Sequence, residues 1–308
     1  MNLPDFPALE SHALEVIGSR FGIPLSNIAR LPQVGICNAI FALGDDLILR
    51  VPRAHEAYTA AIRREAVAVE LARAADVSTP PLVAFDDSLD TLPVPFGVWE
   101  RVRGDTLGLL DLEPEAVVQV WQAVGVDLGR LHVSVLPRPE LSALEPPPMP
   151  EPDVLAGQLE RDGWMGLSEV RWLTRWAQHL ESRGGAVQRR FLHGDLQTTN
   201  IMVSAEREYR ALLDWGACGW GDAAWEFLGV PLRAIPFVLE GYRTTVNTAP
   251  DTGLEARIVR RHLQIGLYLM GRGPQPQTSW AERPFGMILE VMRFLQDAPE
   301  PWRSLRFA

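Results

Sequence analysis

The stretch from residue 191 to 216, FLHGDLQTTNIMVSAEREYRALLDWG, constrains this chain more than any other. It holds Asp195 in the sequence HGD, Asn200 five residues later, and Asp214 in the sequence LLDWG. Short apolar runs flank each polar group, and such runs bounded by polar turns are typical of buried strands. The pattern therefore predicts polar side chains held on a rigid hairpin, which is a frame that suits a functional site.

The three polar residues are of the types that phosphoryl transfer requires. Asn200 and Asp214 offer a neutral and an anionic oxygen from adjacent loops, and Mg²⁺ prefers oxygen ligands together with substrate phosphates. Asp195 is a candidate base for the proton of an attacking hydroxyl. Because the protein mainly positions groups and neutralises charge in this reaction, one base and two ligands supply most of the apparatus. A polar hairpin with capping aspartates is the alternative, but two motifs that agree in order and spacing favour the kinase interpretation.

HGDLQTTNIMV followed by LLDWG resembles the aminoglycoside phosphotransferase and choline kinase-like family, which includes macrolide phosphotransferases. Members are relatives of protein kinases, whose motifs are H-R-D-x-x-x-x-N and D-F-G. Gly194 stands here for the Arg and Trp215 for the Phe, as is usual in the small-molecule branch. The resemblance runs from about residue 33 to residue 227 and is specific only around Asp195 to Asp214.

The resemblance implies an α+β, bilobal, protein-kinase-like fold. The N-terminal, nucleotide-binding lobe is expected over residues 1–103, with a five-stranded antiparallel sheet and a helix. A larger, mainly helical lobe for catalysis and acceptor binding is expected over residues 104–308. Hydrophobic patterning predicts strands at 28–31, 39–41, 47–51, 82–85 and 96–102. It predicts helices at 9–21, 55–75, 113–135, 154–183, 232–247, 254–271 and 282–297.

Two residues of the N-terminal lobe form a candidate ion pair. Arg50 ends a predicted strand in LILRVPR, where the family places its phosphate-contacting base. Glu65 lies on the apolar stripe of the helix predicted at 55–75, and an acid in such a position usually has a partner. The family pairs this Glu with the strand base, so Glu65 is expected to orient Arg50. Arg53 is the alternative candidate to Arg50 for the contact with the nucleotide phosphates.

Two further nucleotide contacts are implied by the resemblance. The turn at residues 33–38, QVGICN, resembles the G-x-x-N form of the turn that covers the phosphates, with Gly35 and Asn38 as its motif residues. By itself this turn reads as a plain hairpin, since its glycine content is low. The segment WERVRG resembles the hinge that holds the base edge, which assigns Glu100 and Val102 to nucleotide binding.

Composition excludes several classes of protein. The chain has 308 residues and a formal net charge of −10, which argues against a nucleic-acid binder and favours cationic small partners; solubility alone explains the charge as well. The 2 Cys are too few for a disulfide framework. Neither a signal peptide nor a membrane span is recognisable, so no membrane contact and a cytoplasmic location are expected.

The acceptor is the least constrained part of the sequence. Trp164 falls in helices that form a wall of the acceptor pocket in relatives, although a Trp pair such as Trp172 and Trp176 in these helices is more often core. Trp225 and Glu226 follow in GDAAWEF, which resembles the family's G-D-x-x-x-[DE] signature, and are candidates to face the acceptor. His132, in the sequence GRLH, is interpreted as a core residue rather than a base.

Together these features predict an Mg²⁺-dependent kinase that transfers a phosphoryl group from ATP or GTP to a hydroxyl of a small molecule. The acceptor is expected to be an antibiotic of the aminoglycoside or macrolide type, inactivated in a resistance reaction. The alternatives are a metabolic kinase of the choline, homoserine or sugar type and a non-catalytic nucleotide-binding module. A protein kinase is disfavoured because no long activation segment separates LLDWG from Gly221-Asp222.

Overall fold

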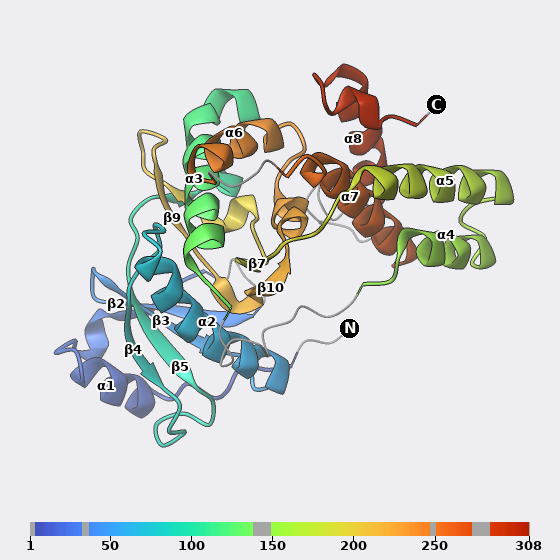
Figure 1. Cartoon of the computed structure of the whole chain (residues 1–308). Helices are drawn as coiled ribbons and strands as arrows, with labels where there is room; N and C mark the ends of the chain where they lie inside the picture. The colour runs from blue at the N-terminus through green and yellow to red at the C-terminus, as the bar shows by residue number, and fades with distance from the viewer. Residues whose placement is uncertain (1–3, 33–36, 138–148, 247–250, 273–283, 308) are drawn as a thin grey trace. The chain divides into compact units, whose positions relative to one another are not determined.

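The computed structural model describes residues 4–32, 37–137, 149–246, 251–272 and 284–307 (Figure 1). The chain groups into two compact units. The first comprises residues 1–111 and 199–218, and the second comprises residues 112–198 and 219–308. This grouping differs from a single boundary near residue 103, because a segment from the middle of the chain belongs to the first unit.

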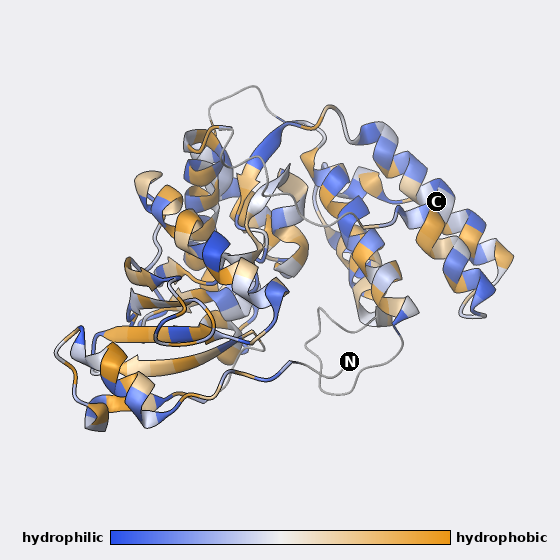
Figure 2. Cartoon of the chain, turned by 90° about the horizontal axis from the view of Figure 1, so that it is seen from below, coloured by the Kyte–Doolittle hydropathy of each residue, from blue (hydrophilic) through white to orange (hydrophobic). Residues whose placement is uncertain are grey.

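The first unit contains the expected five-stranded sheet, in the order β1-β2-β3-β5-β4. Every neighbouring pair is antiparallel. The strands, which carry mostly apolar residues (Figure 2), are β1 (Ile28–Arg30), β2 (Asn38–Leu43), β3 (Leu47–Pro52), β4 (Leu82–Asp86) and β5 (Phe96–Glu100). A positive φ of 59° at Gly44 allows the tight turn between β2 and β3.

Two helices complete this part of the unit. Helix α1 (Ser11–Ser19) contributes Ile17 to a core cluster that includes Leu43, Leu49 and Val98 of the sheet. Helix α2 (Glu56–Ala74) begins where the side chain of His55 accepts the N–H of Ala57. Its buried residues recur at helical spacing, and one of them is the acid Glu65.

A small three-stranded sheet explains why residues 199–218 belong to the first unit. Its order is β6-β8-β9, and the strands are β6 (Asp105–Thr106), β8 (Ile201–Val203) and β9 (Tyr209–Leu212). The N–H of Leu212 donates to the carbonyl of Ser78 at 2.8 Å. The indole N–H of Trp215 donates to the hydroxyl of Thr79 at 3.0 Å. Hydrogen bonds to residues before position 80 therefore tie the hairpin to the N-terminal part of the chain.

The second unit is mainly helical. Its helices are α3 (Val118–Ser134), α4 (Pro152–Arg161), α5 (Leu167–Arg183), α6 (Ile235–Thr245), α7 (Leu254–Gly271) and α8 (Pro284–Asp297). Helices α3 and α6 approach each other closely because each carries a glycine where the two helices meet. A Cβ atom on Gly125 would lie 2.0 Å from the carbonyl oxygen of Val238, and one on Gly241 would lie 1.9 Å from that of Gln122. No side chain fits at either point.

The single helical segment predicted at 154–183 is two helices, α4 and α5, which form a hairpin (Figure 1). Gly163 interrupts it with a φ of 78°, a left-handed conformation that glycine adopts without strain. A two-stranded antiparallel sheet of β7 (Arg189–Leu192) and β10 (Gly219–Asp222) completes the unit. None of the helices in the described part of the chain combines the length and apolar character needed to cross a membrane.

Candidate active site

The HGD sequence forms a tight loop directly after strand β7. Gly194 has a φ of 84°, a left-handed backbone conformation in which glycine is the natural residue. The side chain of His193 is fully buried, and its Nδ1 accepts the N–H of Asp195 at 3.2 Å. Gln197 donates its side-chain amide to Oδ1 of Asp195 at 2.5 Å. His193 thus holds the backbone of Asp195, the candidate base, and Gln197 holds its carboxylate.

Glu226 lies beneath this loop and is completely buried. Its Oε1 accepts the backbone N–H of His193 at 2.5 Å, and its Oε2 is 3.4 Å from the N–H of Gly194. Nε2 of His132 is 3.6 Å from the same Oε1, and Nδ1 of His132 lies 3.0 Å from the hydroxyl of Tyr242. Burial raises the pKa of that Tyr242 hydroxyl to about 12, so it is neutral at physiological pH.

The position of Glu226 corrects the expectation that it faces an acceptor. A carboxylate with no exposed surface, whose two oxygens receive backbone N–H groups, supports the loop rather than contacting a ligand. His132 is buried as expected, but it belongs to this polar network and is not only a packing residue. An acid and a histidine in otherwise apolar surroundings are the sequence signal for such a pairing.

The hairpin β8–β9 brings the two candidate metal ligands to the same end of the small sheet. Ile201 pairs with Leu212, and the N–H of Leu213 donates to the carbonyl of Asn200 at 2.8 Å. Asp214 follows directly, with a φ of 64° that is uncommon for a residue other than glycine. Oxygen donors of these types, on adjacent and firmly hydrogen-bonded backbones, fit the preference of Mg²⁺.

Arg50 connects this hairpin to helix α2. Its guanidinium forms an ion pair with Glu65 through Nη1, as the sequence predicts. Its Nη2 lies 3.3 Å from Oδ1 of Asp214. The N–H of Trp215 is 3.4 Å from Oε1 of Glu65, which ties the acid to the residue after the candidate ligand. One arginine therefore joins strand β3, helix α2 and the LLDWG turn.

Burial governs the electrostatics of this cluster. The side chains of Arg50 and Glu65 are 13% and 2% exposed. Burial raises the pKa of Glu65 to about 7, and the positive charge of Arg50 acts against this rise. Burial also disfavours the charged form of Arg50, but the charges of Glu65 and Asp214 outweigh it and raise the pKa of Arg50. The guanidinium therefore stays charged and points to two acids.

Arg53, the competitor for Arg50, has a different environment. Its Nη1 donates to the carbonyl of Pro4 at 2.6 Å, and its guanidinium stacks on the ring of Phe6 at 4.1 Å. These contacts fasten the N-terminal segment. The role of Arg50 on phosphates remains a prediction, and the pairing with Glu65 distinguishes it from Arg53.

The profile of the phosphotransferase enzyme family matches residues 29–244, more than half of the chain. The chain belongs to this family. The prediction of a phosphotransferase is thereby confirmed, and the motifs around Asp195 and Asp214 fall within the matched residues. No curated protein matches the chain in sequence.

Solved structures share the fold. The GDP complex of aminoglycoside 2'-phosphotransferase-IIIa is 16% identical, with a TM-score of 0.64 over 93% of this chain and 98% of that one. The streptomycin-ATP-APH(2")-IIa ternary complex is 14% identical, with a TM-score of 0.60 over 97% and 99%. A choline/ethanolamine kinase family protein from Mesorhizobium loti is 17% identical, with a TM-score of 0.59 over 95% and 98%. These likenesses confirm the predicted kinase-like fold.

Three of the four remaining nucleotide candidates of this phosphotransferase lie on or beside the five-stranded sheet. Asn38 begins β2, opposite Pro52 of β3. Glu100 ends β5, and Val102 lies two residues beyond it. Gly35 lies outside the described residues. Nucleotide binding by these four residues stays a prediction.

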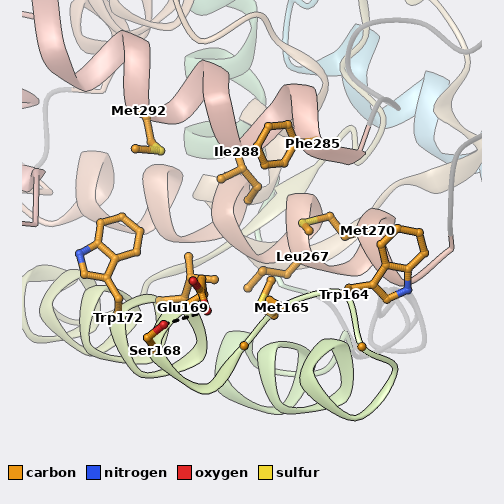
Figure 3. A pocket seen from close by; sticks show the side chains of 13 residues that line it. Trp164, Met165, Ser168, Glu169, Trp172, Leu267, Met270, Phe285, Ile288 and Met292 are labelled. Carbon is orange, nitrogen blue, oxygen red and sulfur yellow. Dashed lines mark hydrogen bonds between the residues drawn. The ribbon is translucent and has the colours of Figure 1, made fainter.

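The acceptor candidates Trp225 and Trp164 lie near two different parts of helix α7. The ring of Trp225 stacks with Arg261 at 4.5 Å. Trp164 lines an apolar groove of about 950 Å³ whose wall includes Met270, nine residues further along α7 (Figure 3). The groove is formed by the α4–α5 connection, α5, α7 and α8, and Glu169 is the one acid among its described lining residues. Figure 1 draws the connection between α4 and α5 away from β7.

Proposed function

We propose that this phosphotransferase transfers the γ-phosphate of ATP or GTP to a hydroxyl group of a small molecule. The observation that carries the proposal is the position of Arg50, which reaches both Glu65 and Asp214 while Asn200 shares the hairpin with Asp214. A cation for phosphates, an acid that orients it and two oxygen ligands for a metal are what a kinase needs on the donor side.

Each residue has one role in the proposed reaction. Asp195 accepts the proton of the acceptor hydroxyl as the hydroxyl oxygen attacks the γ-phosphorus; the bond from the γ-phosphorus to the β,γ-bridging oxygen breaks, and the nucleoside diphosphate leaves. Asn200 and Asp214 would hold Mg²⁺, which supplies charge neutralisation on the donor phosphates. Arg50 binds those phosphates, and Glu65 keeps the guanidinium in place. In keeping with the expected lobes, residues 1–103 bind the nucleotide, and residues 104–308 supply Asp195 and the acceptor site.

We propose an antibiotic of the aminoglycoside or macrolide type as the acceptor, with inactivation of the antibiotic in the cytoplasm as the biological outcome. The net charge of −10 favours amine-bearing molecules, and the structural neighbours include enzymes named for aminoglycosides. The likeness to a choline/ethanolamine kinase family protein keeps a metabolic kinase as the second candidate.

Competition between acceptor classes tests the proposal. Purified protein is incubated with Mg²⁺, ATP or GTP, and one representative each of aminoglycosides, macrolides, choline, homoserine and sugars, and phosphorylated product is detected by mass spectrometry. Phosphorylation of an antibiotic supports the resistance function, and Asp195→Ala serves as the inactive control. Transfer to a metabolite alone replaces that function with a metabolic one. Absence of nucleotide binding in the wild-type protein contradicts both.

A further inference from the structure

Trp99 of strand β5 packs its indole ring against the guanidinium of Arg50. The Cζ atom of Arg50 lies over the ring, 5.2 Å from its centroid. Trp99 is 3% exposed, so this contact is shielded from water. Guanidinium groups are attracted to the faces of aromatic rings, and Trp provides the strongest face.

The register of the sheet explains how the two side chains meet. Arg50 of β3 pairs with Gly97 of β5, so these residues share one face of the sheet. Trp99 follows Gly97 by two residues and therefore points to the same face. A Cβ atom on Gly97 would lie 2.3 Å from Cη2 of Trp99. The missing side chain of Gly97 leaves the space in which the indole lies back along the strand towards Arg50.

The contacts of Arg50 are complementary. Glu65 and Asp214 receive N–H groups at the guanidinium edge, whereas Trp99 covers its face. The indole N–H of Trp99 is buried without a hydrogen-bond partner among the described residues. A buried polar atom without a hydrogen-bond partner costs free energy. The contact between Trp99 and Arg50 is therefore made by the face of the ring and not by its N–H group. A planar guanidinium can use edge and face together, which an ammonium group cannot.

We propose that Trp99 is a positioning residue that holds the Arg50 guanidinium in the orientation in which it meets the donor phosphates. This inference rests on the proposed function, since it takes Arg50 as the phosphate-binding cation. It explains why a bulky aromatic residue stands two positions after a glycine on the strand opposite Arg50.

A double-mutant cycle on nucleotide binding tests the proposal without knowledge of the acceptor. Dissociation constants of MgATP and MgGTP are measured by calorimetry for the wild type, Trp99→Leu, Arg50→Ala and the double variant. Loss of the ring is expected to weaken binding about threefold to tenfold when Arg50 is present. The same change should alter binding less than about twofold in the Arg50→Ala background, because the ring then has no guanidinium to hold.

Two further variants separate positioning from general packing. Trp99→Phe keeps an aromatic face and should restore most of the affinity lost in Trp99→Leu. Phe96→Leu removes another buried ring of β5, one that lies beside Arg20, and should leave the nucleotide affinity unchanged. Thermal unfolding checks that each variant is folded; if Trp99→Leu is not, Trp99→Met takes its place in the cycle.

The outcomes are distinct. Equal weakening by Trp99→Leu in both backgrounds would mean that the ring acts on the nucleotide or on the fold directly, and would overturn the proposal. Unchanged affinity in Trp99→Leu would overturn it as well. A wild-type protein that binds neither nucleotide would instead reject the proposed function, and this inference with it.

Discussion

The carboxylate of Glu226 accepts the backbone N–H of His193, a residue 33 positions earlier in the chain. Neither side chain has measurable exposure. Because His193 precedes the candidate base by two residues, a buried acid far away in the sequence fixes the backbone on which Asp195 is carried.

Glu226→Gln should lower kcat about tenfold to a hundredfold while leaving the nucleotide dissociation constant near that of the wild type. The amide places an N–H group where Glu226 now offers an oxygen, so one of the two loop N–H contacts is lost. Steady-state kinetics and nucleotide titration measure the two effects. The matched control is Glu240→Gln, a change at an exposed acid on α6. An unchanged kcat would show that the loop does not depend on Glu226.

Asp195→Ala should reduce phosphoryl transfer by about 10²–10⁴-fold, the usual cost of losing a general base. Folding and nucleotide binding should be nearly unaffected, since the substitution removes a side-chain acceptor of the Gln197 amide and of the substrate proton. Single-turnover kinetics measure the chemical step. Retention of more than about a tenth of the wild-type rate would contradict the assignment of Asp195 as the base.

Asp214→Asn should raise the Mg²⁺ concentration required for nucleotide binding and for activity. Asn200→Ala should have a smaller effect in the same direction, because it removes a neutral oxygen and not an anionic one. Titration of nucleotide binding against Mg²⁺ compares the two variants. If the magnesium requirement of Asp214→Asn equalled that of the wild type, Asp214 would not be a metal ligand.

Arg50→Ala and Glu65→Ala should both raise the KM for nucleotide and lower kcat, with Arg50→Ala the more severe. Their effects should not be additive, because the two residues form one ion pair. The double variant tests this directly, and losses that simply add would argue that the pair does not act as a unit. Arg53→Ala is the control, since Arg53 contacts Pro4 and Phe6 instead.

The stability of the second unit should depend on pH through His262 of helix α7. Burial lowers the pKa of His262 to about 4, from an ordinary value of 6.5. A depressed pKa stabilises the folded state above pH 6.5, and this contribution is lost as the pH falls from 6.5 towards 4. The full contribution is about 3 kcal/mol. Unfolding midpoints between pH 7 and pH 4 should therefore fall less steeply in His262→Leu than in the wild type, and parallel curves would contradict the assignment.

The predictable parts of the site share one property, which is that their geometry is local. The order HGD, Asn200 and LLDWG lies within one loop and one hairpin, so spacing alone indicates which side chains lie at the strand ends. The position of Glu65 on an apolar helix stripe likewise indicates a buried acid in need of a partner. The break between α4 and α5 was also visible in the sequence, as Gly163, but the helical periodicity on either side hid it.

The sequence by itself determined the family, the kinase-like fold and the residues proposed for the chemistry, because short-range spacing specifies strands, turns and helix faces. Only the tertiary structure decided that Glu226 supports the HGD loop, that Trp99 lies against Arg50, and that Trp164 belongs to an apolar groove. These contacts join residues that are far apart in the chain. They depend on strand register and helix packing, which the local pattern of residues does not specify.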